Sequence, residues 1–173
     1  MEGVRMFSIF KKKEKKQQEE KKVCSAVTAC ISCQVIPIES VEDEVFSKKV
    51  LGPGVAIRPT GQIITAPCDG VISVVMEASG HAVGMTLDNG AELLIHEGID
   101  TVELEGEGFK LYVKAGQRVH ANDPLIEFDA EFLADKGYDT TCIIVLTNPE
   151  QFPDVSFVTD VDGVQNQTRI MCF

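Results

Sequence analysis

The chain has 173 residues, of which 44% are hydrophobic and 25% charged, and its formal net charge is −11. This length and composition favour one domain with a substantial core. The negative charge argues against nucleic acid as a partner, because the phosphate backbone is itself anionic. No stretch approaches the ~20 apolar residues of a membrane span, and the pattern of a signal peptide is absent, so we expect a cytoplasmic protein.

Charge is distributed unevenly along the chain. Residues 1–22 hold eight Lys or Arg and four Glu, a net of +4, which leaves −15 on residues 23–173. We therefore assign residues 1–22 to a flexible basic tail and residues 23–173 to a single domain. The tail opens with an apolar cluster and continues with lysines, which suits either a solvated, partly helical segment or weak contact with a membrane surface.

From residue 23 onward, short β-type runs alternate with turn signals rich in Gly and Pro. The runs are residues 23–31, 33–38, 54–59, 62–67, 70–76, 82–87, 92–96, 101–104, 109–113, 124–128, 142–146 and 155–158. Many short strands at this spacing predict an all-β sandwich or barrel. Residues 42–49 and 130–136 are each predicted to form one or two helical turns.

Two of the three histidines flank a predicted hairpin. Asn89-Gly90 lies between two β-type runs, and this dipeptide is a strong signal for a two-residue hairpin loop. Such a loop places Asp88 opposite Ala91, which fixes the register of the whole hairpin.

In this register Val83 faces His96, and His81 lies two residues before Val83 on the same face. The two histidines are then diagonal neighbours, roughly 7–8 Å apart at the backbone, and their rings can meet. A three-residue loop would shift the register by one residue and send the rings to opposite faces.

Two adjacent imidazoles are compatible with three interpretations. One ring can accept a phosphoryl group while the other donates a proton to its oxygens. The pair can instead supply two ligands of a zinc site, which needs a third protein ligand. The hairpin can also carry two histidines without any chemistry, and spacing does not decide between the three.

Several motifs in fixed order carry a resemblance to a known family. The stretch LIHEGIDTVELEGEGF, with the upstream GPGVAIRPTG and ITAPCDGVIS, resembles the glucose-type enzyme IIA domain of the bacterial phosphoenolpyruvate-dependent sugar phosphotransferase system. The likeness runs over residues 35–128 and more loosely to residue 148. It implies an antiparallel β-sandwich with a shallow apolar depression around the histidines.

The resemblance also implies roles for individual residues. His96 corresponds to the family's phosphoryl acceptor, which receives the group from the phosphocarrier protein HPr and passes it to a sugar-specific IIB domain or IIBC permease. His81 corresponds to the histidine that steadies the phosphoryl group, Ser79 to the hydroxyl two residues before it, and Asp100 to the aspartate of the motif. We expect backbone N–H groups of residues 98–100 to complete the phosphoryl cradle. No cofactor is implied.

Two segments around these residues need separate interpretation. Val45, Phe46, Val50 and Leu51 form an apolar cluster flanked by acids, either a turn that caps the barrel or, by resemblance, the surface that docks HPr and the IIB domain. Glu97 departs from the family, where this position is usually apolar. A strand would direct its carboxylate away from His96.

The remaining histidine and the cysteines are predicted to carry no chemistry. His120 is expected at the surface. The six cysteines lack the density of a secreted scaffold and are expected to be reduced thiols. They are Cys24, Cys30, Cys33, Cys68, Cys142 and Cys172.

Two alternative functions belong to other classes. A zinc hydrolase of related β-architecture needs an HxH pair with a further His and Asp, and the sequence contains no HxH. An interaction module would report sugar supply by binding transporters or kinases.

Overall fold

The computed structural model describes residues 24–173, and the predicted tail lies outside these residues. Most of the regular secondary structure in this range is β-strand. The strands are β1 (Ala26–Thr28), β2 (Cys33–Pro37), β3 (Gly54–Pro59), β4 (Ile63–Thr65), β5 (Gly70–Val75), β6 (Ala82–Leu87), β7 (Glu92–Glu97), β8 (Phe109–Leu111), β9 (Arg118–Val119), β10 (Pro124–Phe128), β11 (Cys142–Leu146), β12 (Ser156–Phe157), β13 (Val161–Gly163) and β14 (Arg169–Cys172). The helices are α1 (Glu44–Ser47), α2 (Ala130–Asp135) and the 3-10 segments η2 (Ile38–Ser40), η3 (Thr101–Leu104) and η4 (Pro149–Gln151).

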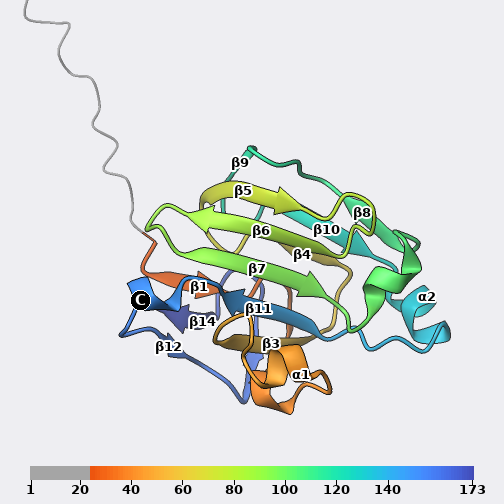
Figure 1. Cartoon of the computed structure of the whole chain (residues 1–173), viewed down its shortest axis with the longest axis horizontal. Coiled ribbons are helices and arrows are strands. Elements are labelled where there is room, and N and C mark those ends of the chain that lie inside the picture. Colours follow the sequence, from red (N-terminus) through yellow and green to blue (C-terminus); the bar gives the residue numbers. More distant parts are fainter. Residues whose placement is uncertain (1–23) are drawn as a thin grey trace, which may run out of the picture.

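The strands form three antiparallel sheets. The largest has the order β13-β2-β3-β11-β7-β6-β5-β9, and two smaller sheets have the orders β4-β10-β8 and β1-β14-β12. Figure 1 shows β5, β6 and β7 in front of β4, β8 and β10, while β1 and β14 lie side by side near the C-terminus. The prediction of an all-β, antiparallel sandwich or barrel with short helical turns is confirmed.

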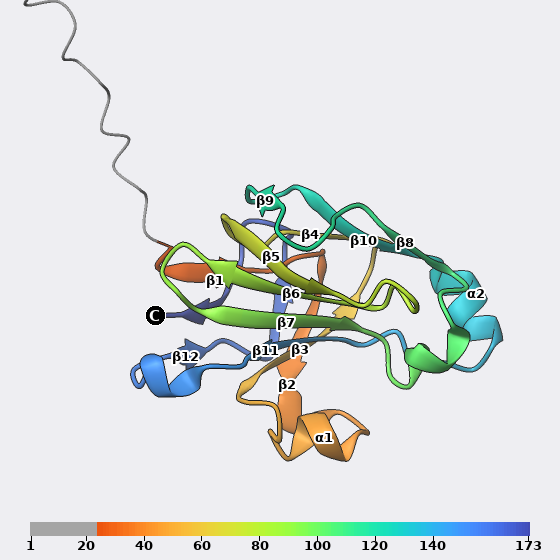
Figure 2. The ribbon, with the colours of Figure 1, turned by 45° about the horizontal axis from the view of Figure 1, so that its top comes forward.

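The two faces of the large sheet contact different apolar clusters. Ile36, Ala56, Ile143, His96 and Ala82 pair in a row across five neighbouring strands, so they share one face, which we call the outer face. This face packs under η2 and α1 through a small apolar cluster. The opposite, inner face contributes to the larger core, which is shared with the other sheets. Figure 2 shows α1 beside β2 and β3, on the side of the barrel away from β9.

The hairpin between β6 and β7 has a different register from the predicted one. Ala82 rather than Val83 pairs with His96, and Thr86 pairs with Glu92. The loop therefore contains three residues, Asp88 to Gly90. The Asn89 side chain accepts a hydrogen bond from the Ala91 backbone at 3.0 Å, which stabilises the longer loop.

Two further predictions need correction. Residues 101–104 form the 3-10 segment η3 and not a strand, because Asp100 and Glu105 on either side adopt left-handed backbone conformations that end extended structure. The expectation of six reduced thiols is wrong for Cys24 and Cys68, which are joined by a disulfide. Their Cα atoms lie 6.7 Å apart although 44 positions separate them in sequence, so local pattern could not reveal the pairing.

The predicted helical turns are present as α1 and α2. Asp43 caps α1 by accepting hydrogen bonds from two backbone N–H groups, and Asp129 caps α2 in the same way with one. None of the helices in residues 24–173 has the length and apolar character needed to cross a membrane.

Candidate functional site

The rings of His81 and His96 meet, with their centroids 4.6 Å apart at an angle of 81°. His96 projects from the outer face of β7. His81 lies one residue before β6 and follows Gly80, whose φ of +66° turns the chain. The regular alternation of side chains does not extend to this position, and for this reason the rings converge even though the predicted register was wrong.

Ser79 holds the second ring. Its Oγ lies 2.6 Å from Nδ1 of His81, and both side chains are buried. The preceding strand β5 has a register shift between Ile72 and Val74, so it absorbs one extra residue before the Ser79 turn. With Nδ1 engaged, Nε2 is the nitrogen of His81 that remains for a third group.

His96 lies in a largely apolar setting. The Phe46 ring packs edge-on against it at 4.9 Å, and Nδ1 of His96 is buried without a hydrogen-bond partner among the described residues. Burial, and to a lesser extent the charge of His81, lowers the pKa of His96 to about 4, opposed by the Gly98 backbone and the Asp43 carboxylate. Burial also lowers the pKa of His81. Both rings are therefore neutral near pH 7, which leaves His96 nucleophilic.

The turn after His96 is fixed by buried hydrogen bonds. The Thr101 hydroxyl donates to the backbone carbonyl of Glu97 at 2.6 Å and is itself completely buried. Gly98, at φ +75°, packs so closely on Thr101 that an added Cβ would lie 2.3 Å from its Cγ2. Thr101 was not among the predicted site residues, although it belongs to the GIDTV motif.

Two of the three N–H groups predicted to form the phosphoryl cradle, those of Gly98 and Ile99, bond elsewhere in the chain. The N–H of Gly98 donates to the carbonyl of Thr141 at 3.1 Å, and the N–H of Ile99 donates to that of Asp139 at 2.9 Å. These two groups are engaged in pairing with the chain before β11 and are not free for phosphoryl oxygens. Asp100 is exposed and directly precedes η3 as its N-cap residue.

Glu97 points to the inner face, away from His96, as predicted. It pairs in register with Cys142 and is completely buried, and neither carboxyl oxygen has a hydrogen-bond partner among the described residues. Burial raises the pKa of Glu97 well above its ordinary value, opposed by the nearby Cys142 thiol. The carboxyl is therefore neutral at low and moderate pH and does not repel a phosphoryl group on His96.

The predicted partner surface divides into a covered part and an open part. Phe46 is buried against His96, whereas Val45, Val50 and Leu51 are 43%, 69% and 42% exposed. Val45 lies in α1 and Val50 and Leu51 follow it, so the helix whose Phe46 contacts His96 also carries exposed apolar side chains.

Acidic groups gather on one side of this apolar surface. A hollow of about 290 Å³ is lined by Ile99, Tyr138 and four carboxylates. The carboxylates are Glu42, Asp100, Glu103 and Asp139. Asp43, which sequence analysis did not single out, caps α1 and also acts electrostatically on His96.

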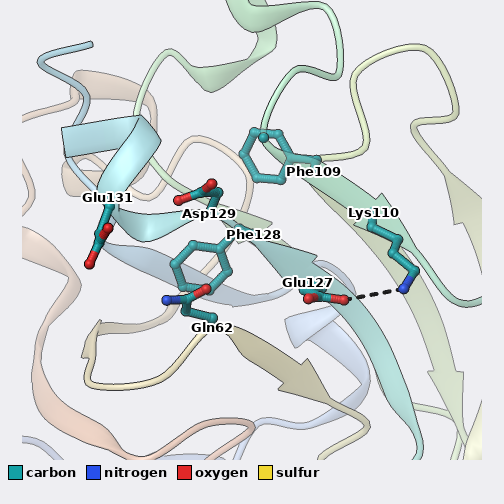
Figure 3. A pocket seen from close by; sticks show the side chains of 8 residues that line it. Gln62, Phe109, Lys110, Glu127, Phe128, Asp129 and Glu131 are labelled. Atoms are coloured by element: carbon teal, nitrogen blue, oxygen red, sulfur yellow. Dashed lines mark hydrogen bonds and ion pairs between the residues drawn. The ribbon is translucent and has the colours of Figure 1, made fainter. Parts of the chain in front are cut away.

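A larger hollow lies elsewhere on the molecule. It measures about 470 Å³ and is lined by residues of β8, β10 and the start of α2 (Figure 3). In Figure 3 the Phe109 and Phe128 rings lie among carboxylates, and Lys110 pairs with Glu127 at 3.4 Å. None of the predicted site residues lines this cavity, so its size does not connect it with the histidine chemistry.

The zinc interpretation needs a third ligand. In the part of the chain that the structure describes, no group of three or more His, Cys, Asp or Glu side chains is arranged to hold a metal ion. His120 is exposed, as predicted, and its Nδ1 lies 3.6 Å from Asp69.

Comparison with known proteins identifies the family. The family described as phosphoenolpyruvate-dependent sugar phosphotransferase system, EIIA 1, matches residues 25–152. The glucose-specific EIIA component of Bacillus anthracis is 41% identical over 134 residues, 78% of this chain and 81% of that protein. That of Haemophilus influenzae is 46% identical over 125 residues, 72% of this chain and 75% of that protein.

A longer relative and a solved structure agree with this family match. The glucose-specific EIIBCA component of Corynebacterium glutamicum is 43% identical over 129 residues, 75% of this chain, but the match covers only 19% of that protein's length. The glucose permease IIA from Mycoplasma capricolum superimposes with a TM-score of 0.76 at 31% identity, covering 84% of this chain and 93% of that one. The chain therefore belongs to the EIIA 1 family of the phosphoenolpyruvate-dependent sugar phosphotransferase system.

Proposed function

We propose that the protein is a phosphoryl carrier in which His96 accepts a phosphoryl group from phospho-HPr and passes it to a IIB domain or IIBC permease for coupled sugar uptake. The observation that carries the proposal is the contact between two neutral imidazoles, one of them in an apolar setting at the edge of an exposed surface. Membership of the EIIA 1 family supports it.

In this mechanism Nε2 of His96 attacks the phosphorus, because Nδ1 is buried. The Nε2–P bond forms as the bond to the histidine of HPr breaks, and the electron pair stays on the HPr nitrogen. The Ser79 hydroxyl donates to Nδ1 of His81, which fixes the tautomer that carries the proton on Nε2. This N–H then donates to a phosphoryl oxygen on His96, so His81 stabilises the transferred charge.

The same surface suits two successive partners. The exposed apolar residues Val45, Val50 and Leu51 form a centre, and the acidic hollow beside them forms a charged rim, which is the composition of a transient interface. A basic face of HPr or of a IIB domain complements the rim. The EIIBCA names of two relatives support a IIB-type and IIC-type partner. We place the carrier in the cytoplasm, on the side where HPr acts.

Single substitutions test these roles with phosphoenolpyruvate, enzyme I, HPr and a cognate IIB domain. In His96→Ala, phosphoryl acceptance is expected to disappear, because the nucleophile is lost. In His81→Gln, acceptance is retained and onward transfer slows by about 10²-fold or more, the scale of a lost proton donor. Radiolabelled phosphate on the carrier and on IIB gives both rates.

The exposed His120 provides a matched control, since His120→Ala changes a histidine outside the site and both rates should equal those of the parent. Undiminished acceptance in His96→Ala would refute the assignment. Transfer from His81→Gln at the parental rate would remove the role of the second ring.

A regulatory role remains compatible with the same surface. Phosphorylation of His96 adds negative charge beside the apolar patch. The carrier can therefore bind transporters or kinases in one phosphorylation state only. Pull-downs with parent protein and His96→Ala, before and after phosphorylation, separate this role from carriage. State-dependent retention supports it, and equal retention in both states excludes it.

A further inference from the structure

Three cysteines gather where the described chain begins, away from the histidines. Cys24 and Cys68 form the disulfide. Cys172 is free and half-buried, and its strand neighbour is Ala26, two residues after Cys24. Figure 1 shows β1 and β14 side by side at this end of the barrel. A cavity of about 320 Å³ is lined by both bonded cysteines.

The cavity walls carry one charge of each sign, Arg169 and Asp69. Arg169 is exposed, lies opposite Thr28 in the β1–β14 ladder, and has no ion-pair partner within residues 24–173. Asp69 is already engaged by the Ala121 backbone N–H at 2.8 Å and by His120. The unengaged group at this cavity is thus a guanidinium, which favours an anionic ligand, above all a carboxylate.

We propose that this cavity is a thiolation site, at which a low-molecular-weight thiol bearing a carboxylate exchanges with the Cys24–Cys68 disulfide. The carboxylate pairs with Arg169. The thiolate sulfur attacks Sγ of Cys68, an S–S bond forms between them, and the Cys24–Cys68 bond breaks with its electron pair on Cys24. Cys24 takes up the proton that the incoming thiol released, so no external oxidant is needed.

The direction of attack follows from exposure. Cys68 is half-buried, whereas Cys24 is 7% exposed, so Cys68 is the sulfur that a ligand in the cavity reaches. The volume is at the lower end of the range for small-molecule sites, which suits a thiol of peptide size or smaller. Cys30, Cys33 and Cys142 are buried and do not compete.

This site is separate from the histidine pair. Cys68 precedes β5, and the Ser79–His81 turn follows the other end of that strand, whose six residues span roughly 20 Å. Thiolation is therefore expected to leave phosphoryl acceptance by His96 unchanged, and the two proposals can fail independently.

The test uses the full chain with Cys172→Ser. This substitution removes the half-buried free thiol, so that among the described cysteines outside the core only the disulfide can react. Incubation with reduced glutathione should give one adduct, located by peptide mass spectrometry on Cys68, with Cys24 alkylatable. The rate of disulfide opening is measured with glutathione and with uncharged 2-mercaptoethanol. The ratio of the first rate to the second should be several-fold lower in Arg169→Gln than in the parent. Lys110→Gln, which removes an exposed cation at a different cavity, should leave this ratio unchanged.

Three results would overturn the proposal. An adduct on Cys24 would place the attack on the wrong sulfur. An unchanged ratio in Arg169→Gln would show that the guanidinium does not recognise the carboxylate. Alkylation of both cysteines before any thiol is added would show that there is no disulfide to exchange.

Discussion

At the scale of single residues, the environment of His96 decides its chemistry. An imidazole with an ordinary pKa near 6.5 is partly protonated at pH 6, whereas burial lowers the pKa of His96 to about 4. We expect an NMR titration to show the ring neutral down to about pH 5. A His96 titration midpoint near 6.5 would contradict the apolar setting described here.

Glu97 places a carboxyl group in a largely apolar core. Its carboxyl is buried without a hydrogen-bond partner among the described residues, so Glu97→Leu should raise the free energy of unfolding by about 1–3 kcal/mol. Because the folded state holds the proton at a higher pKa, the contribution of Glu97 to stability falls as pH rises above the ordinary value of 4.5.

Urea unfolding at several pH values measures both effects. The difference in stability between Glu97→Leu and the parent should grow with pH, since only the parent has to bury a charge or keep a proton. Glu107→Leu, at an exposed position, is the control and should change stability by less than about 0.5 kcal/mol. A parent that is more stable than Glu97→Leu at pH 8 would mean that the carboxyl has a partner in the native state.

At the scale of elements, Glu97 connects the turn that follows β7 with the segment that carries His81. The carbonyl of Glu97 accepts from Thr101, and its N–H donates to the carbonyl of His81 at 2.8 Å. Thr101→Val leaves a buried carbonyl unsatisfied and should lower the free energy of unfolding by about 1–3 kcal/mol. Thr101→Ser keeps the hydroxyl and should lose less. Chemical denaturation ranks the two, and equal losses would show that packing, not the hydrogen bond, is responsible.

The hairpin shows what sequence pattern can and cannot determine at this scale. Asn89-Gly90 correctly located the turn, but a hydrogen bond that the Asn89 side chain accepts from the Ala91 backbone N–H selects a three-residue loop that no dipeptide rule distinguishes. The convergence of His81 and His96 depends on the turn at Gly80, outside the ladder. Predicting that the rings meet was correct, while the register used to derive it was wrong.

At the scale of the whole molecule, alternating short runs and turn residues were sufficient to predict an all-β sandwich or barrel, while the antiparallel arrangement followed from the family resemblance. The pattern did not reveal β9, β13 or β14, which are two to four residues long. Nor did it reveal that β1 pairs with β14, because contacts between the two ends of a domain leave no periodic signal. For the same reason the Cys24–Cys68 disulfide and the cavity beside it were missed.

The acidic surface leads to a prediction about association. Residues 23–173 carry a net charge of −15, and carboxylates including Glu42 and Glu103 line the hollow beside Ile99. Glu42→Gln with Glu103→Gln should slow phosphoryl transfer from HPr at low ionic strength, and the difference should shrink as salt shortens the Debye length. Stopped-flow rates over a salt series measure this.

The control for this prediction is a double substitution of equal charge outside the site. Glu131→Gln with Glu150→Gln removes two exposed carboxylates that do not line the hollow. It should reduce the rate less at every salt concentration. Equal effects of the two pairs would show that only net charge, and not its position, steers the partner.

The measurement that tests phosphoryl transfer through His96 most directly is the location of the phosphoryl group on the parent protein. After incubation with phosphoenolpyruvate, enzyme I and HPr, peptide mass spectrometry under alkaline conditions and NMR of the imidazole nitrogens identify the modified atom. A single acid-labile phosphoryl group on Nε2 of His96 is predicted. A group on His81 or His120, or no group on any histidine, would contradict the account.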